Sequence, residues 1–84
     1  MRAIKVRAKV GAEEELWVLP LGRLVAIQWA KLKSGGAFLH LHFDRLTLTA
    51  SDPDGALLEE ANRALEGSDG TYAIGGLWSY EWVE

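Results

Sequence analysis

Apolar and polar residues alternate at the start of the chain. Every second residue from Ile4 to Val10 is apolar, and the residues between them are lysine or arginine. A period of two is typical of a β-strand with one buried and one solvated face. A turn at residues 11–13 and an apolar, aromatic run at residues 15–19 follow, so the pattern predicts a β-hairpin here.

The middle of the chain predicts further strands. Residues 23–33 carry apolar side chains on both alternating positions at their centre, which is typical of a central strand covered on both faces. Ser34-Gly35-Gly36 predicts a turn, and residues 37–43 alternate again. At Asp44-Arg45 the apolar positions change parity. We expect a bulge or tight bend there rather than a hairpin turn, because the pair lacks the glycine that two-residue loops prefer.

Residues 53–66 form the clearest predicted element, an amphipathic helix. Between residues 57 and 65 the apolar side chains fall at helical spacing and form one stripe, with charged residues opposite. Ser51 or Asp52 is suited to cap its first turn, and Gly67 to end it in a left-handed conformation. A helix of about three turns is not stable alone, so we expect it to pack on the sheet.

Two segments after the helix predict strands again. Residues 71–74 and 77–83 are separated by Gly75-Gly76, which marks a bend or bulge. The chain is long enough for one small domain, residues 1–84. The order of elements predicts an α+β fold, with a mostly antiparallel sheet of five or six strands curled around the one helix and a strand after the helix.

The composition is that of a folded domain and limits which classes of protein this chain can belong to. The hydrophobic fraction is 49% and the charged fraction 25%, which excludes a disordered or low-complexity chain. The apolar stretch 24–30 is far shorter than the roughly 20 residues of a membrane helix, and the first residues do not resemble a secretion signal. We therefore expect a cytoplasmic protein without membrane contact. The single Gln, single Asn and absence of Cys also fit a thermophilic origin.

The absence of cysteine excludes disulfides, thiolate metal sites and cysteine nucleophiles. No serine lies in a nucleophile motif and no glycine run has the spacing of a phosphate loop, which favours a non-enzymatic role without a cofactor. A core of this size contributes only about 3–5 kcal/mol of net stability. Small domains often gain the missing stability by association with a second copy or another protein, so we expect a homodimer first.

Aromatic residues on the last predicted strand are the leading candidates for a function. We expect a small, self-associating interaction domain, because tryptophan and tyrosine are enriched at the energetic centres of interfaces. Two other roles for these side chains stay open: packing in the core, and stacking against a ligand. The interface or ligand-stacking candidates share one face of the strand and are Trp78, Tyr80 and Trp82.

Two alternative functions follow from other residues. His40, His42 and Asp44 alternate on one strand, and two imidazoles with a carboxylate suit a divalent metal ion, although a solvated strand face is the plainer interpretation. A basic first strand could bind nucleic acid weakly, but the formal net charge of -3 argues against this, and outward lysines also protect a sheet edge. The basic candidates are Arg2, Lys5, Arg7 and Lys9.

Overall fold

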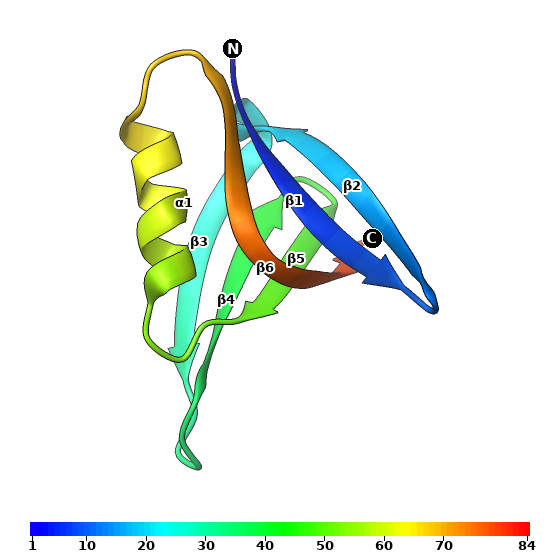
Figure 1. The fold of residues 1–84 in the computed structure, drawn as a ribbon, viewed down its shortest axis with the longest axis vertical. Coiled ribbons are helices and arrows are strands. Elements are labelled where there is room, and N and C mark those ends of the chain that lie inside the picture. Colours follow the sequence, from blue (N-terminus) through cyan, green and yellow to red (C-terminus); the bar gives the residue numbers. More distant parts are fainter.

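Six strands form one sheet in the order β2-β1-β6-β5-β4-β3, and one helix lies between β5 and β6 in the chain (Figure 1). The computed structural model describes residues 1–84, apart from the side chain of Val10. The elements are β1 (Arg2–Val10), β2 (Glu13–Pro20), the short 3-10 helix η1 (Leu21–Arg23), β3 (Leu24–Lys31), β4 (Ala37–Phe43), β5 (Leu46–Ser51), α1 (Ala56–Glu66) and β6 (Gly70–Trp82). The predicted α+β fold, with a strand after the helix, is confirmed.

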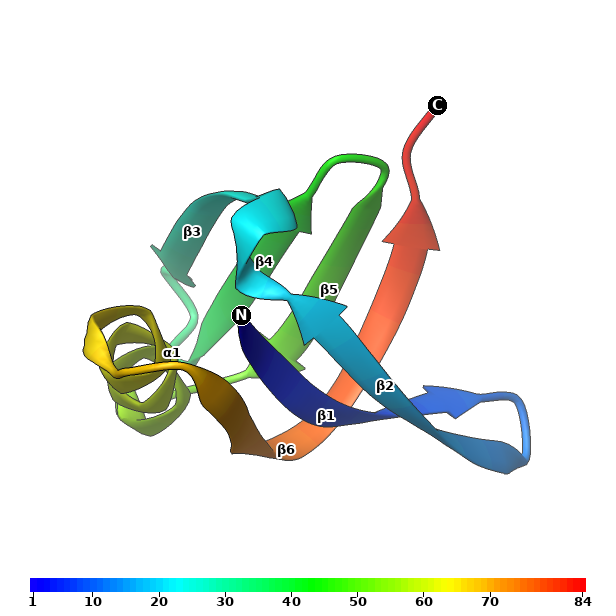
Figure 2. The same cartoon turned by 90° about the horizontal axis from the view of Figure 1, so that it is seen from above.

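The last strand, β6, lies between the β1–β2 hairpin and the strands β3 to β5 in the sheet. β6 pairs in parallel with β1 and antiparallel with β5, and all the other neighbouring strands pair antiparallel. The predicted sheet, mostly antiparallel, is therefore confirmed, with one parallel pair. Seen from above, the strands wrap around a common interior, and β2 and β3 form the two edges of the sheet (Figure 2).

The core lies on the inner side of this curved sheet. Strand residues of one parity point inward and meet the apolar stripe of α1, which contacts β6 and β1. The predicted alternation in β1 is confirmed as far as Ala8, and the side chain of Val10 lies outside the described part of the chain. The largest fully buried side chains include Trp78, Ile4, Leu39, Leu41, Leu48 and Val6. Among the described residues, no helix is long and apolar enough to span a membrane.

The connection at Asp44-Arg45 is a hairpin turn, so the expected bulge is wrong. β4 and β5 pair on either side of it, with His42 opposite Thr47. Phe43 and Leu46 flank the two-residue loop and are both buried, which is why the inward positions change from odd to even numbers. Neither loop residue has a positive φ, so this turn does not require glycine.

β3 is an edge strand, so the expected central position of residues 23–33 is also wrong. It pairs with β4, and Val25 is 69% exposed. The apolar residues on the inner face of β3 make two different kinds of contact. Ile27 packs against the core, and the Trp29 indole covers the loop before α1, where its Nε1 donates a hydrogen bond to the main-chain oxygen of Asp52 at 3.0 Å.

The helix begins at Ala56, three residues later than expected. The preceding residues form a turn that ends at Gly55, which has a φ of 77°. The cap predicted at Asp52 is nevertheless present. Its buried carboxylate accepts hydrogen bonds from the main-chain N–H groups of Leu57 and Leu58, both at 2.9 Å. This satisfies two of the unpaired donors at the start of a helix.

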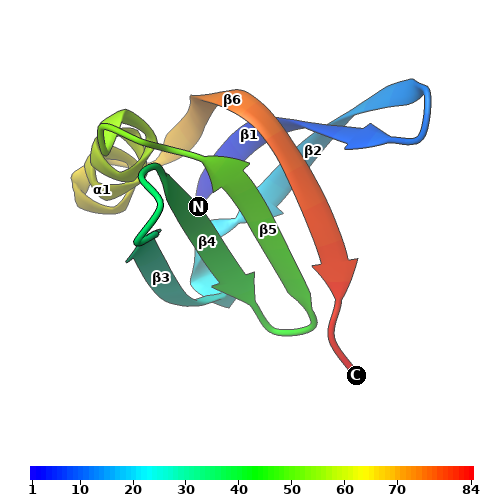
Figure 3. The ribbon, with the colours of Figure 1, turned by 90° about the horizontal axis from the view of Figure 1, so that it is seen from below.

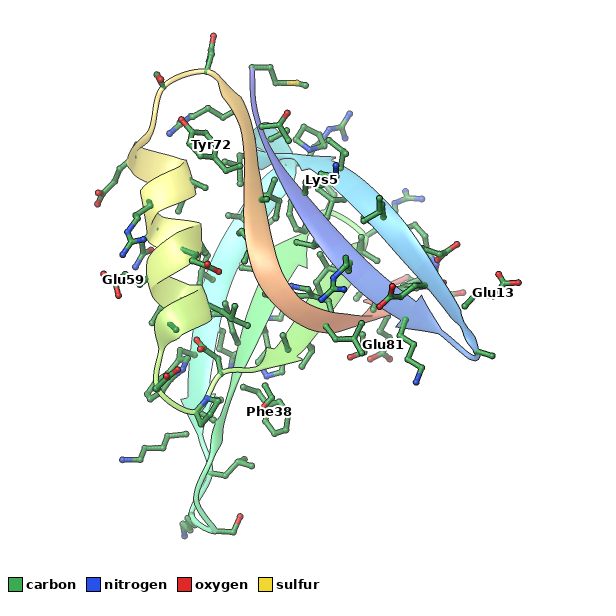
Figure 4. All side chains as sticks on the ribbon, in the orientation of Figure 1. Lys5, Glu13, Phe38, Glu59, Tyr72 and Glu81 are labelled. Carbon is green, nitrogen blue, oxygen red and sulfur yellow. The ribbon has the colours of Figure 1, made fainter. Side chains whose placement is uncertain are left out.

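The helix does not end in the expected left-handed glycine. Gly67 has a φ of -75° and is extended. Glycine is needed there for another reason, because the Tyr72 ring lies so close to Gly67 that a Cβ atom would collide with it. Tyr72 lies where the chain enters β6, beside the end of α1 (Figure 4), and its hydroxyl donates a hydrogen bond to the Ser68 carbonyl.

The predicted bulge at Gly75-Gly76 is confirmed, and the two predicted segments around it form the single strand β6. The pairing with β1 passes from Lys5 opposite Ala73 to Arg7 opposite Leu77, so β6 contains two extra residues here. Gly76 has a φ of 84°, and a Cβ atom at this position would lie 3.0 Å from Leu57 Cδ1 of the helix.

Replacing Gly76 with alanine should lower the free energy of unfolding by about 1–2 kcal/mol, because an L side chain is strained at this φ. Equilibrium denaturation in urea measures the change. Gly75→Ala is the matched control, since its Cβ would make only an ordinary contact at 3.8 Å to Glu60 Oε2. Equal losses in the two variants would show that the backbone conformation at Gly76 is not the cause.

Candidate functional site

Trp78 belongs to the core and not to a surface. Its side chain is 0% exposed, and its indole Nε1 donates a hydrogen bond to the Gly75 carbonyl at 3.0 Å. Of the three aromatic candidates on the last strand, this one therefore has the core-packing role that the sequence left open. We accordingly remove Trp78 from the candidate surface.

Tyr80 and Trp82 lie further along β6 and join a third aromatic residue from β2. Trp17 has its ring centroid 4.8 Å from Tyr80 and 5.9 Å from Trp82, while Tyr80 and Trp82 are 6.2 Å apart. Tilted and edge-on aromatic pairs at such distances attract one another. Tyr80 and Trp17 are half-buried, whereas Trp82 is 63% exposed. We call Trp17, Tyr80 and Trp82 the aromatic surface.

The curl of the sheet brings Trp17 to this place. Trp17 lies opposite Val6 in the β1–β2 hairpin, so both point to the inner side. β1 separates β2 from β6, but its pairing with β6 ends at Ala8 opposite Trp78. Beyond that point the β1–β2 hairpin and the end of β6 diverge and leave an opening between them (Figure 2). Trp17 packs across this opening against Tyr80. Because residues 16–19 are all apolar, the sequence shows neither the inward direction of Trp17 nor the strand order.

The second half of β6 is also an open edge. Residues 79–82 pair with β5 on one side, from Ser79 opposite Thr49 to Trp82 opposite Leu46. On the other side, within the described residues, the ladder to β1 stops at Trp78. Figure 3 shows this half of β6 at the border of the β3–β6 part of the sheet. Its main chain is therefore accessible next to the aromatic surface.

A groove of about 440 Å³ lies on the outer side of the same opening. Its walls include Lys9, Phe38 and Leu77, and the Ser51 and Ser79 side chains add polar groups. Phe38 projects near the start of β4 (Figure 4), and both it and Leu77 are exposed apolar side chains. The opening therefore presents apolar groups on both of its sides.

The two histidines lie on the outer face of β4, opposite the core. His40 Nδ1 is 2.9 Å from Thr49 Oγ1, and His42 Nδ1 is 3.1 Å from Thr47 Oγ1. The two imidazole rings are stacked, with centroids 6.0 Å apart and an interplanar angle of 27°. His42 Nε2 also lies 3.0 Å from Gln28 Oε1 on β3.

Asp44, the third residue of the predicted metal set, has a different partner. Its carboxylate binds Arg23 Nη1 at 3.0 Å, in the turn after β4. Across the described part of the chain, no three His, Cys, Asp or Glu side chains gather as a metal-binding group. The structure therefore keeps the two histidines together and separates Asp44 from them.

The basic candidates do not form one surface. Lys5, Arg7 and Lys9 point outward from β1, and Figure 4 shows Lys5 on this strand. Arg2 is half-buried, and its Nη1 donates to the Gly67 carbonyl at 3.5 Å. Glu14 of β2 lies opposite Lys9 in this row and forms an exposed ion pair with Arg7 at 3.7 Å. Glu14 therefore weakens the positive potential that binding to phosphates requires.

The geometry thus contains an exposed aromatic surface beside an open strand edge, and a separate pair of outer-face histidines. Comparisons with protein-family models, with curated proteins and with solved structures match this chain to none of them.

Proposed function

We propose that this protein is a non-enzymatic interaction domain that self-associates through the aromatic surface of Trp17, Tyr80 and Trp82. The observation that carries the proposal is the exposure of Trp82, at 63%, on top of two aromatic rings that are already packed together. Single exposed apolar residues are common, but an exposed tryptophan on a preorganised aromatic base is typical of an interface centre.

The energetics favour this surface because little order has to be created on binding. Trp17 and Tyr80 hold each other through ring contact at 4.8 Å, so their side-chain freedom is already restricted in the single chain. Binding then costs less entropy than it would for free side chains. Burial of most of the Trp82 indole would remove a large apolar area from water, at about 25 cal/mol per Å².

The open half of β6 supports the same proposal. A strand edge with an unpaired main chain can accept another extended segment, and the added hydrogen bonds contribute affinity while nearby side chains contribute specificity. Residues 79–82 supply such an edge beside Trp82. A second copy carries the same edge and the same aromatic surface, which is the requirement for a two-fold symmetric contact.

Replacing Trp82 with alanine should weaken self-association by roughly tenfold or more, which corresponds to about 1.4 kcal/mol. Light scattering during size-exclusion chromatography, at several loading concentrations, gives the molar mass and the association constant. We expect the unmodified protein to approach the mass of a dimer as concentration rises, and Trp82→Ala to stay close to the mass of one chain.

Leu16→Ala is the matched control. Leu16 is 65% exposed, close to the value for Trp82, but it points to the outer face of β2. Its truncation should leave the association constant unchanged. A strictly monomeric unmodified protein, or an equal loss of association in both variants, would contradict the proposal and leave the aromatic surface to a different partner.

A further inference from the structure

We propose that His40 and His42 form a binding site for one divalent transition-metal ion on the outer face of β4, without Asp44. This site lies on the face of the sheet opposite the aromatic surface and does not depend on self-association. The inference rests on how neighbouring strands hold the two imidazole rings.

Threonines of β5 orient both rings in the same way. Thr49 Oγ1 holds Nδ1 of His40, and Thr47 Oγ1 holds Nδ1 of His42. The two nitrogens of an imidazole lie on opposite sides of the ring, so both Nε2 atoms face away from β5. His42 Nε2 is directed toward β3 and donates a hydrogen bond to Gln28 Oε1 at 3.0 Å, so Nδ1 of this ring accepts from the Thr47 hydroxyl before an ion binds.

This arrangement is the one that metal-binding histidines require. An imidazole binds a metal through one neutral nitrogen, while its other nitrogen donates to a neighbouring oxygen that fixes the tautomer and the ring orientation. Here Thr47 and Thr49 supply these oxygens at their Nδ1 atoms. Nε2 is then the metal-binding nitrogen of each ring. In His42 the ion takes the place of the hydrogen bond to Gln28 Oε1, and the ring proton moves to Nδ1, where Thr47 Oγ1 accepts it. Gln28 Oε1 can then accept a hydrogen bond from a metal-bound water.

The rings must approach each other for a shared ion. With metal–nitrogen bonds of about 2.0–2.1 Å, two nitrogens of a tetrahedral centre lie about 3.4 Å apart. The ring centroids are 6.0 Å apart and nearly parallel, and both side chains lie on the outer face with partial exposure. We expect an ion to draw the two Nε2 atoms together by tilting both rings about their contacts with the threonines. Waters fill the remaining positions, because no carboxylate of the described residues joins the pair.

The test is titration of untagged protein with Cu²⁺ and with Zn²⁺, followed by calorimetry. We expect one ion per chain and tighter binding of Cu²⁺, which is the preferred ion for nitrogen ligands. His40→Gln and His42→Gln should each weaken binding by roughly 100-fold, more than the effect of changing an outer partner. Thr47→Val together with Thr49→Val should weaken binding by about tenfold, since both histidines remain but lose their orientation.

Asp44→Asn separates this site from the three-residue set that the sequence predicts. The two-histidine site requires unchanged affinity in this variant. Loss of binding in Asp44→Asn, unchanged binding in both histidine variants, or uptake of no ion by the unmodified protein would each overturn the proposal. In the unmodified protein, Zn²⁺ should also shift the ring-proton NMR signals of His40 and His42, and signals that do not move would overturn it as well.

Discussion

Replacing Trp78 with alanine should lower the free energy of unfolding by about 3–5 kcal/mol, the usual loss for a fully buried tryptophan. Trp78 is the largest fully buried side chain and lies where β6 leaves β1. Truncation would leave a cavity among the buried side chains that surround Trp78. The hydrogen bond from Nε1 to the Gly75 carbonyl would also be lost. A domain of this size has little stability to spare, so the variant should be partly unfolded at room temperature.

Urea denaturation followed by circular dichroism measures this loss. Trp82→Ala is the matched control, because it removes the same side chain from the same strand at a position that is 63% exposed. Its effect on the stability of the single chain should stay below about 1 kcal/mol. Comparable losses in the two variants would contradict the division of the last strand into a buried tryptophan and a surface tryptophan.

Replacing Asp52 with alanine should lower the free energy of unfolding by about 2–4 kcal/mol, because charge-assisted hydrogen bonds are lost inside the protein. Asp52 is 1% exposed, and its carboxylate accepts from the N–H groups of Leu57 and Leu58. Its main chain also connects two strands to the helix. The Asp52 N–H donates to the Ala37 carbonyl of β4 at 2.9 Å, and the Asp52 carbonyl oxygen accepts from Trp29 Nε1 of β3 at 3.0 Å.

Thermal unfolding measures this second loss, with an expected decrease in Tm of about 4–8 °C for each kcal/mol in a domain of this size. Asp54→Ala is the control. Asp54 is exposed and makes one bond, to the Ala56 N–H at 3.2 Å, so its removal should cost about 0.5 kcal/mol. If the two aspartates contributed equally, burial of the Asp52 carboxylate would not be the source of its effect.

Local patterns predict most of the elements correctly. The alternation at the start of the chain, the apolar stripe of residues 57–65 and the glycines at residues 35–36 and 75–76 depend on neighbours in the sequence alone. The wrong predictions concern where elements begin and end, and which strands lie next to each other in the sheet. Gly67 is explained by contact with the Tyr72 ring, which no local rule reveals.

The candidate sites show the same division. The sequence placed Trp78, Tyr80 and Trp82 on one face of a strand, which is correct, but alternation cannot show that the ladder to β1 ends within this run. Only that ending makes Trp78 a core residue and leaves Trp82 exposed. Likewise, His40 and His42 share a face by parity, while the separation of Asp44 follows from the hairpin turn and its bond to Arg23.

The sequence by itself determined the α+β class, the alternation of the first strand and the presence of one capped amphipathic helix, because periodicity and capping are local properties of the backbone. The tertiary structure alone decided that β6 lies between β1 and β5, that β3 is an edge strand, and that Trp17 meets Tyr80. Such pairings are settled by the burial of the whole set of apolar faces at once, and residues distant in the chain contribute equally to that free energy.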